Sequence, residues 1–117
     1  MGSVLVVDDE IDICMLVTQQ LKSIGIATDY ALSIKEALSM TAFHPFDLYI
    51  IDLNLTDGSG FTLLEKLKEL QPDSRIIIIS AYDNESKRAI KNGADLFVAK
   101  PLSKKRIQDA LHAVNFV

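Results

Sequence analysis

Acidic, hydroxyl and basic side chains follow four short apolar segments of this chain. Asp8 and Asp9 follow residues 3–7, Asp52 follows residues 48–51, Ser80 follows residues 76–79, and Lys100 with Pro101 follows residues 96–99. Unbroken apolar runs of this length are typical of strands that are buried on both faces of a parallel sheet. Ligands of such sheets bind beyond the carboxyl ends of the strands. One edge of one sheet is therefore expected to carry three carboxylates, a hydroxyl and an ammonium group.

Asp8, Asp9 and Asp52 predict a site for a divalent metal ion. Adjacent carboxylates repel one another unless a cation lies between them. Three oxygen ligands with room for water suit Mg²⁺, with Mn²⁺ as an alternative, better than Zn²⁺ or a Ca²⁺ cage. The rival interpretation is that the first two acids only cap the following helix. That interpretation leaves the matching positions of the other strand-end residues unexplained.

Asp52 is the candidate nucleophile of this edge. A carboxylate can attack phosphorus and form an acyl phosphate. Three carboxylates would repel the incoming phosphoryl group, and a metal ion together with the Lys100 ammonium would offset that repulsion. Ser80 is placed to donate a hydrogen bond to a phosphoryl oxygen. Pro101 restricts the backbone at Lys100 and permits a cis peptide bond.

Five apolar strands alternate with five helical segments along the chain. Strands are expected at residues 3–7, 27–31, 47–52, 75–80 and 94–99, and helices at residues 11–24, 33–41, 61–70, 84–92 and from Ser103 to near Phe116. Such alternation predicts right-handed βαβ units and a doubly wound α/β fold with a parallel sheet. A single domain over residues 1–117 is expected. Two strand orders are common for sheets of this kind, and periodicity does not choose between them.

Composition narrows the function classes. A length of 117 residues is enough for one domain and too short for two, and the 49% of hydrophobic residues provide a sizeable core. No apolar run approaches the roughly 20 residues that span a bilayer, and the single Cys14 cannot form an internal disulfide. No signal peptide is expected before the first strand. These features predict a cytoplasmic protein without a membrane partner. The net charge of −4 argues against nucleic-acid binding by this chain alone.

The chain resembles the receiver domain of two-component response regulators. The resemblance is carried by four segments: VLVVDDE, LYIIDLNLTDGSG, IIIISA and GADLFVAKPLS. The resemblance implies a flavodoxin-like sheet with strand order 2-1-3-4-5. It implies a phosphorelay function, in which Asp52 accepts a phosphoryl group from the phosphohistidine of a sensor histidine kinase or of a histidine phosphotransfer protein. The domain would be a phosphoacceptor rather than an enzyme, although it would promote its own phosphorylation and dephosphorylation. A downstream effector domain or protein would be its other partner.

The resemblance also implies a role for each residue of the metal site. Asp9 matches the acid that binds the metal directly, and Asp8 matches the acid that reaches Mg²⁺ through water. Asp52 would be both phosphoacceptor and metal ligand, and the backbone carbonyl of Asn54 would be a further ligand.

A second set of residues would pass the signal on. Ser80 matches the switch hydroxyl of the family and Phe97 the switch aromatic, and Lys100 with Pro101 matches a lysine that is followed by a cis proline. Phosphorylation is expected to change the surface formed by the fourth helix, fifth strand and fifth helix. Thr56 and Ile34 depart from the frequent proline and glycine of the family, and both are expected to lie away from the chemistry.

Three other functions fit parts of the sequence. A phosphatase of the haloacid-dehalogenase type has a DxDxT motif that Asp52 to Thr56 resembles, but the second acid is Asn54 here and its nucleophile normally follows the first strand. A flavin-binding flavodoxin-like domain needs Ser, Thr and Gly after the first strand to hold phosphate, where this chain has acids. A protein-binding pseudo-receiver would lack part of the site, and here every required residue is present.

Overall fold

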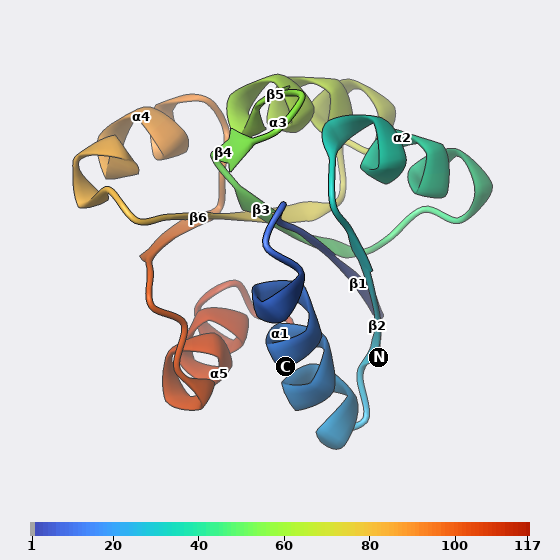
Figure 1. Ribbon diagram of the computed structural model, residues 1–117, viewed down its shortest axis with the longest axis vertical. Coiled ribbons are helices and arrows are strands. Elements are labelled where there is room, and N and C mark those ends of the chain that lie inside the picture. The colour runs from blue at the N-terminus through green and yellow to red at the C-terminus, as the bar shows by residue number, and fades with distance from the viewer. Residues whose placement is uncertain (1) are drawn as a thin grey trace.

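The apolar segments form a five-stranded parallel sheet in the computed structural model, which describes residues 2–117 (Figure 1). Its strands are β1 (Ser3–Val7), β2 (Ala27–Ala31), β3 (Leu48–Asp52), β6 (Arg75–Ser80) and β7 (Leu96–Ala99). Their order across the sheet is β2-β1-β3-β6-β7, and every neighbouring pair is parallel. Counted by the strands of this sheet alone, the order is 2-1-3-4-5, so the predicted doubly wound, flavodoxin-like fold is confirmed.

Helices cover both faces of the sheet. They are α1 (Ile11–Ser23), α2 (Ile34–Phe43), α3 (Gly60–Leu70), α4 (Ser86–Lys91) and α5 (Lys104–Ala113). Figure 1 shows α1 and α5 on one face and α2, α3 and α4 on the other. Successive side chains of a strand point to opposite faces, so Val4 and Val6 belong to the core under α1 and α5, and Leu5 and Val7 belong to the core under α2 and α3.

Two strands begin later in the chain than predicted. β3 begins at Leu48 and β7 at Leu96, and the residue before each strand adds a side-chain hydrogen bond to its backbone hydrogen bonds with the neighbouring strand. Asp47 Oδ2 accepts a hydrogen bond from the Ser3 backbone N–H at 2.9 Å, and Asp95 Oδ2 accepts one from the Ile76 N–H at 2.8 Å. Both acids lie at the edge of the sheet opposite the predicted site.

Two connections also differ from the prediction. The loop after β3 contains a small antiparallel hairpin of β4 (Asn54–Leu55) and β5 (Gly58–Ser59). The fourth helix is divided into a 3₁₀ turn, η1 (Asp83–Glu85), and the short α4, and neither of these segments has a side-chain N-cap. The helices α2 and α5 do have the predicted caps, since Ser33 Oγ accepts from Glu36 N–H and Ser103 Oγ accepts from Arg106 N–H.

Candidate functional site

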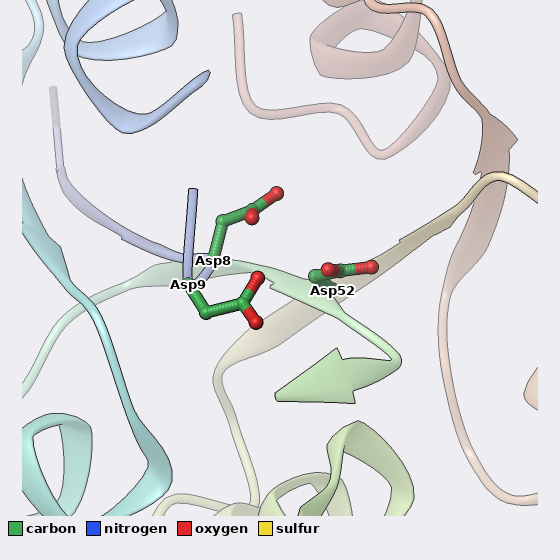
Figure 2. Close-up of side chains that lie close together, drawn as sticks. All are labelled: Asp8, Asp9 and Asp52. Atoms are coloured by element: carbon green, nitrogen blue, oxygen red, sulfur yellow. The ribbon is translucent and has the colours of Figure 1, made fainter. Parts of the chain in front are cut away.

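Three carboxylates meet where β1 and β3 end, as Figure 2 shows. One oxygen of each of Asp8, Asp9 and Asp52 lies within 4.8 Å of the others. β1 and β3 are neighbours in register, with Val7 beside Ile51, so the residues that follow them are brought together. Asp8 is completely buried and Asp52 is 4% exposed, whereas Asp9 is exposed. The metal-site acids predicted from sequence thus lie together, two inside the protein and one at its surface.

Lys100 provides the positive charge among these acids. Its Nζ lies 3.0 Å from Asp8 Oδ2, 3.4 Å from Asp52 Oδ2 and 3.8 Å from Glu10 Oε2. The lysine follows β7, its backbone N–H donates to the Ser80 carbonyl oxygen at 2.8 Å, and its peptide bond to Pro101 is cis. One ammonium group therefore faces several carboxylates, and the local charge remains negative.

Burial, together with the neighbouring charges, shifts the pKa values of these groups. Burial raises the pKa of Asp52 to about 6, and the Asp8 charge acts in the same direction, against the smaller effects of Lys100 and the Asn54 N–H. Burial also raises the pKa of Asp8. For Lys100, burial would lower the pKa, but its hydrogen bond to Asp8 and the charges of Asp52 and Asp8 together raise it. Both buried acids hold protons more tightly than free carboxyl groups, because burial disfavours their charged forms and the Lys100 ammonium does not fully offset that effect.

The donor set fits a divalent cation. Apart from its ion pair with Lys100, the buried Asp8 Oδ2 has no hydrogen-bond partner among the described residues. Buried carboxylates are costly unless cations offset their charge, and here one lysine ammonium faces both Asp8 and Asp52. Carboxylate oxygens close together, with one of them open to solvent, are the ligands that Mg²⁺ uses. Asn54, the fourth predicted ligand, lies two residues beyond Asp52 at the start of β4.

Ser80 ends β6, the strand next to β3, and is 1% exposed. Its Oγ accepts a hydrogen bond from the Tyr82 N–H at 3.1 Å, so the hydroxyl hydrogen remains free to be donated elsewhere. Ser80 lines a pocket of about 360 Å³, and the pocket walls include Asn54, Ser59 and Tyr82. Ser80 therefore shares a pocket wall with Asn54, the residue two positions after Asp52.

Phe97 lies apart from the charged cluster. It sits within β7, opposite Ile78 of β6, and packs half-buried against the core under α2, α3 and α4. Its position connects the strand that leads to Lys100 with the layer that contains α4.

The sequence profile of the response regulator receiver domain matches residues 4–112 of the chain. The chain belongs to this family. It is a receiver domain of the kind used in signalling, and its fold and functional class are those that the sequence predicted.

Known relatives of this receiver domain are longer proteins. It is 36% identical over 107 residues to the response regulator protein PilR of Pseudomonas aeruginosa, covering 90% of this chain and 24% of PilR. It is 32% identical over 111 residues to the acid tolerance regulatory protein ActR of Rhizobium meliloti, covering 93% of this chain and 57% of ActR. The receiver domain thus spans at most 57% of either relative.

Solved structures match the receiver domain almost end to end. A CheY-like receiver domain protein from Methanospirillum hungatei has a TM-score of 0.91 at 26% identity, covering 99% of this chain and 95% of that one. The response regulator protein TrrA from Thermotoga maritima, in complex with Mg²⁺ and BeF, has a TM-score of 0.88 at 27% identity, covering 97% and 99% of the two chains. Within residues 2–117 of the receiver domain, none of the helices has the length and apolar character that crossing a membrane requires.

Some residues around the receiver site were not predicted from sequence. Glu10 reaches Lys100, and the acidic run that it closes was a signal for this contact. Arg88 lines the pocket with Phe61, and its guanidinium carbon lies 4.4 Å from the centre of the Phe61 ring. Cys14 is buried behind the site, and its Sγ donates to the Asp8 carbonyl oxygen at 3.2 Å. Burial raises the pKa of this thiol to about 12, so it is unreactive as a thiolate.

Proposed function

We propose that this receiver domain, comprising residues 1–117, accepts a phosphoryl group on Asp52 in a Mg²⁺-dependent reaction. The donor is the phosphohistidine of a sensor histidine kinase or of a histidine phosphotransfer protein. The observation that carries the proposal is the imbalance of charge at the carboxyl edge of the sheet. There the buried Asp8 and Asp52 share the single ammonium of Lys100, and the pKa of Asp52 is raised to about 6.

The cation would be held by Asp8, Asp9, Asp52 and the backbone carbonyl of Asn54. When bound, Mg²⁺, or Mn²⁺ in its place, offsets the electrostatic repulsion between the carboxylates and an incoming phosphoryl group. The close grouping of the three carboxylates supports this assignment, as does the buried Asp8 Oδ2, which has no partner among the described residues apart from Lys100. The similar fold of TrrA, whose structure was solved in complex with Mg²⁺ and BeF, also supports it.

The residues of the chain divide the transfer between them. A carboxylate oxygen of Asp52 attacks phosphorus, the bond from phosphorus to the imidazole nitrogen breaks, and its electron pair stays on that nitrogen. Lys100, which is already 3.4 Å from Asp52, stays close to the transferred phosphoryl oxygens and offsets their charge. Ser80 donates its free hydroxyl hydrogen to one of them. Asn54 is an amide, so the second acid that a haloacid-dehalogenase phosphatase requires is missing from this position.

Ser80 and Phe97 would pass the phosphorylated state to the surface of α4, β7 and α5. When Ser80 moves toward the phosphoryl group, it leaves space that Phe97 fills. This surface carries half of the twelve basic residues of the chain, all six of them exposed: Lys87, Arg88, Lys91, Lys104, Lys105 and Arg106. A downstream effector domain or protein would bind there. We place the whole process in the cytoplasm, where histidine kinases present their phosphohistidine.

Phosphorylation by a small-molecule donor tests the proposal. Wild type incubated with phosphoramidate and Mg²⁺ should gain one phosphoryl group in its intact mass, and the group should be labile to base. Asp52→Asn should gain none. Asp73→Asn is the matched control, since it changes an exposed acid between α3 and β6, and it should react as wild type does. Absence of the mass shift in wild type, or an undiminished shift in Asp52→Asn, would refute the assignment.

The switch has a separate test. Beryllium fluoride with Mg²⁺ should mimic the phosphoryl group on Asp52, and backbone amide NMR shifts should then extend to residues 84–109. Shifts that remain confined to the loops around Asp8, Asp52 and Lys100 would show that Ser80 and Phe97 do not act as a switch in this chain.

A further inference from the structure

The β4–β5 hairpin joins the candidate metal site to helix α2. Each of its strands has two residues, and Thr56 and Asp57 form the turn between them. A two-stranded hairpin is marginally stable in water, and one this short needs outside contacts to keep a single conformation. Leu55 provides one such contact, because its side chain is buried in the core under α2 and α3.

Asp57 provides a second contact, at the tip of the hairpin. Its Oδ1 accepts a hydrogen bond from the Ile34 N–H at 2.9 Å, and its Oδ2 accepts one from the Lys35 N–H at 3.0 Å. These are the first two amides of α2, which have no partners within the helix. Ser33 Oγ accepts from the Glu36 N–H at 3.1 Å, so two side chains divide the capping of this turn.

The charge of Asp57 strengthens the contact. A carboxylate at a helix N-terminus interacts favourably with the helix dipole, and hydrogen bonds to a charged acceptor are stronger than neutral ones. The two N–H groups lower the pKa of Asp57, so the carboxylate is ionised at neutral pH. The tip of the hairpin is therefore held to α2 by a pair of charge-assisted hydrogen bonds.

The base of the same hairpin carries Asn54. There the Gly60 N–H donates to the Leu53 carbonyl oxygen at 2.9 Å, and a Cβ at Gly60 would collide with the backbone carbonyl oxygen of Asp52. The base thus packs directly on the end of β3, and the tip is fixed on α2. A hairpin held at both ends cannot rotate about β3, so the Asn54 carbonyl keeps one position relative to the Asp52 carboxylate.

We propose that Asp57 is a positioning residue for the metal site. By joining the hairpin tip to the first turn of α2, it holds the Asn54 carbonyl in the position from which that group binds Mg²⁺. This inference rests on the proposed function, because Asn54 is a ligand only if the site binds the cation. Asp57 acts on the affinity for Mg²⁺ more than on the rate of phosphorylation once Mg²⁺ is saturating.

Mg²⁺ titrations of four proteins, followed by amide NMR, test the inference. The proteins are wild type, Asp57→Ala, Asp57→Asn and Ser33→Ala. Ser33→Ala is the matched control, since it removes a cap from the same turn of α2 without touching the hairpin. Asp57→Ala should lose hydrogen-exchange protection at Ile34 and Lys35 and bind Mg²⁺ about tenfold more weakly, as is usual for residues that orient metal ligands.

The Mg²⁺ affinities of the other two variants should lie between those of wild type and Asp57→Ala. Asp57→Asn keeps one acceptor oxygen, so its Mg²⁺ affinity should be intermediate. If Asp57→Ala does not fold, Asp57→Asn replaces it in the comparison with wild type and Ser33→Ala. Ser33→Ala should bind Mg²⁺ within about twofold of wild type. With phosphoramidate as donor, Asp57→Ala should need about tenfold more Mg²⁺ for its half-maximal rate, while its rate at saturating Mg²⁺ stays close to that of wild type.

Two results would overturn the inference alone. One is that Asp57→Ala loses amide protection at Ile34 and Lys35 and still binds Mg²⁺ as wild type does. The other is that Ser33→Ala weakens Mg²⁺ binding as much as Asp57→Ala, because loss of helix stability would then explain both. Failure of wild type to bind Mg²⁺ would be a different result, since it would overturn the proposed function and this inference with it.

Discussion

The two edges of the sheet use aspartate in opposite ways. At the amino edge, the exposed Asp47 and Asp95 each accept a hydrogen bond from a backbone amide at the start of a neighbouring strand, Ser3 or Ile76, and Asp95 Oδ2 also lies 4.0 Å from Lys68 Nζ. At the carboxyl edge, Asp8 and Asp52 are buried, and burial raises the pKa of both.

The difference separates a structural role from a functional one. The amino-edge acids each have their own donor and stabilise the ends of strands. The carboxyl-edge acids are held in an environment that disfavours their charge, and a bound cation would relieve that unfavourable state. Groups kept in such an environment by the fold are typical of functional sites.

The largest expected difference is in the stability lost when the lysine of each edge is replaced, Lys100 at the carboxyl edge and Lys68 at the amino edge. Lys100→Met leaves buried carboxylates without their ammonium, so it should lower the free energy of unfolding by about 3 kcal/mol in metal-free protein and abolish phosphorylation of Asp52. Lys68→Met removes only an exposed ion pair and should cost under about 1 kcal/mol. Urea denaturation with EDTA at neutral pH measures both. An equal loss of unfolding free energy in the two variants would contradict the proposed difference between the edges.

The carboxyl edge should also make stability depend on pH. Between about pH 4 and pH 6 the folded protein keeps a proton on Asp52 that the unfolded chain has released, so metal-free stability should fall as the pH rises through this range. The raised pKa corresponds to a loss on the order of 2–3 kcal/mol. Urea denaturation of wild type and Asp52→Asn across this range isolates the effect, because the variant lacks this titration. A wild-type minus variant difference that is constant with pH would contradict this expectation.

Removal of a carboxylate should lower stability at the amino edge, whereas removal of one from the metal-site acids should raise it. Asp47→Ala removes the acceptor of the Ser3 N–H and should lower stability by about 1 kcal/mol, the usual value of one hydrogen bond. Its Mg²⁺ response should equal that of wild type, whereas Asp9→Ala should raise metal-free stability and lose the Mg²⁺-dependent gain. Thermal melts with and without Mg²⁺ compare the two. A loss of Mg²⁺ response in Asp47→Ala would show that the edges are not independent.

The smallest expected effect concerns the lifetime of the phosphorylated protein. Tyr82 is 63% exposed and lines the pocket beside Ser80, where it would limit the access of water to an acyl phosphate. Loss of the ring in Tyr82→Ala should shorten a lifetime of minutes or longer by a few fold. Phe43→Ala, which removes an exposed ring at the end of α2, should leave it unchanged. Slower decay in Tyr82→Ala would contradict the shielding role.

The carboxyl edge could be predicted because it depends on strand ends. Buried strands appear as apolar runs, and the residue after each run must lie at the same edge of a parallel sheet. Asp8, Asp52 and Lys100 could be placed together on this basis, and the strand order followed from family resemblance. The burial of Asp8 and the exposure of Asp9 could not be predicted, because two adjacent residues at a strand end have no fixed orientation.

The hairpin and its contact with α2 could not be predicted in the same way. Strands of two residues have no measurable periodicity, and the hydrogen bonds of Asp57 join positions 22 and 23 residues apart in the sequence. Thr56 and Ile34 were expected to lie away from the chemistry. In the fold they adjoin this contact, since Thr56 precedes Asp57 in the turn and the Ile34 N–H is one of its donors.

Amide NMR during a Mg²⁺ titration tests the central claim most directly, because it observes both edges of the sheet in one experiment. We predict saturable shifts at Asp8, Asp9, Asp52 and Asn54, with the amides of Asp47 and Asp95 unchanged. Absence of saturable shifts at the carboxyl edge, or shifts of equal size at both edges, would contradict the claim.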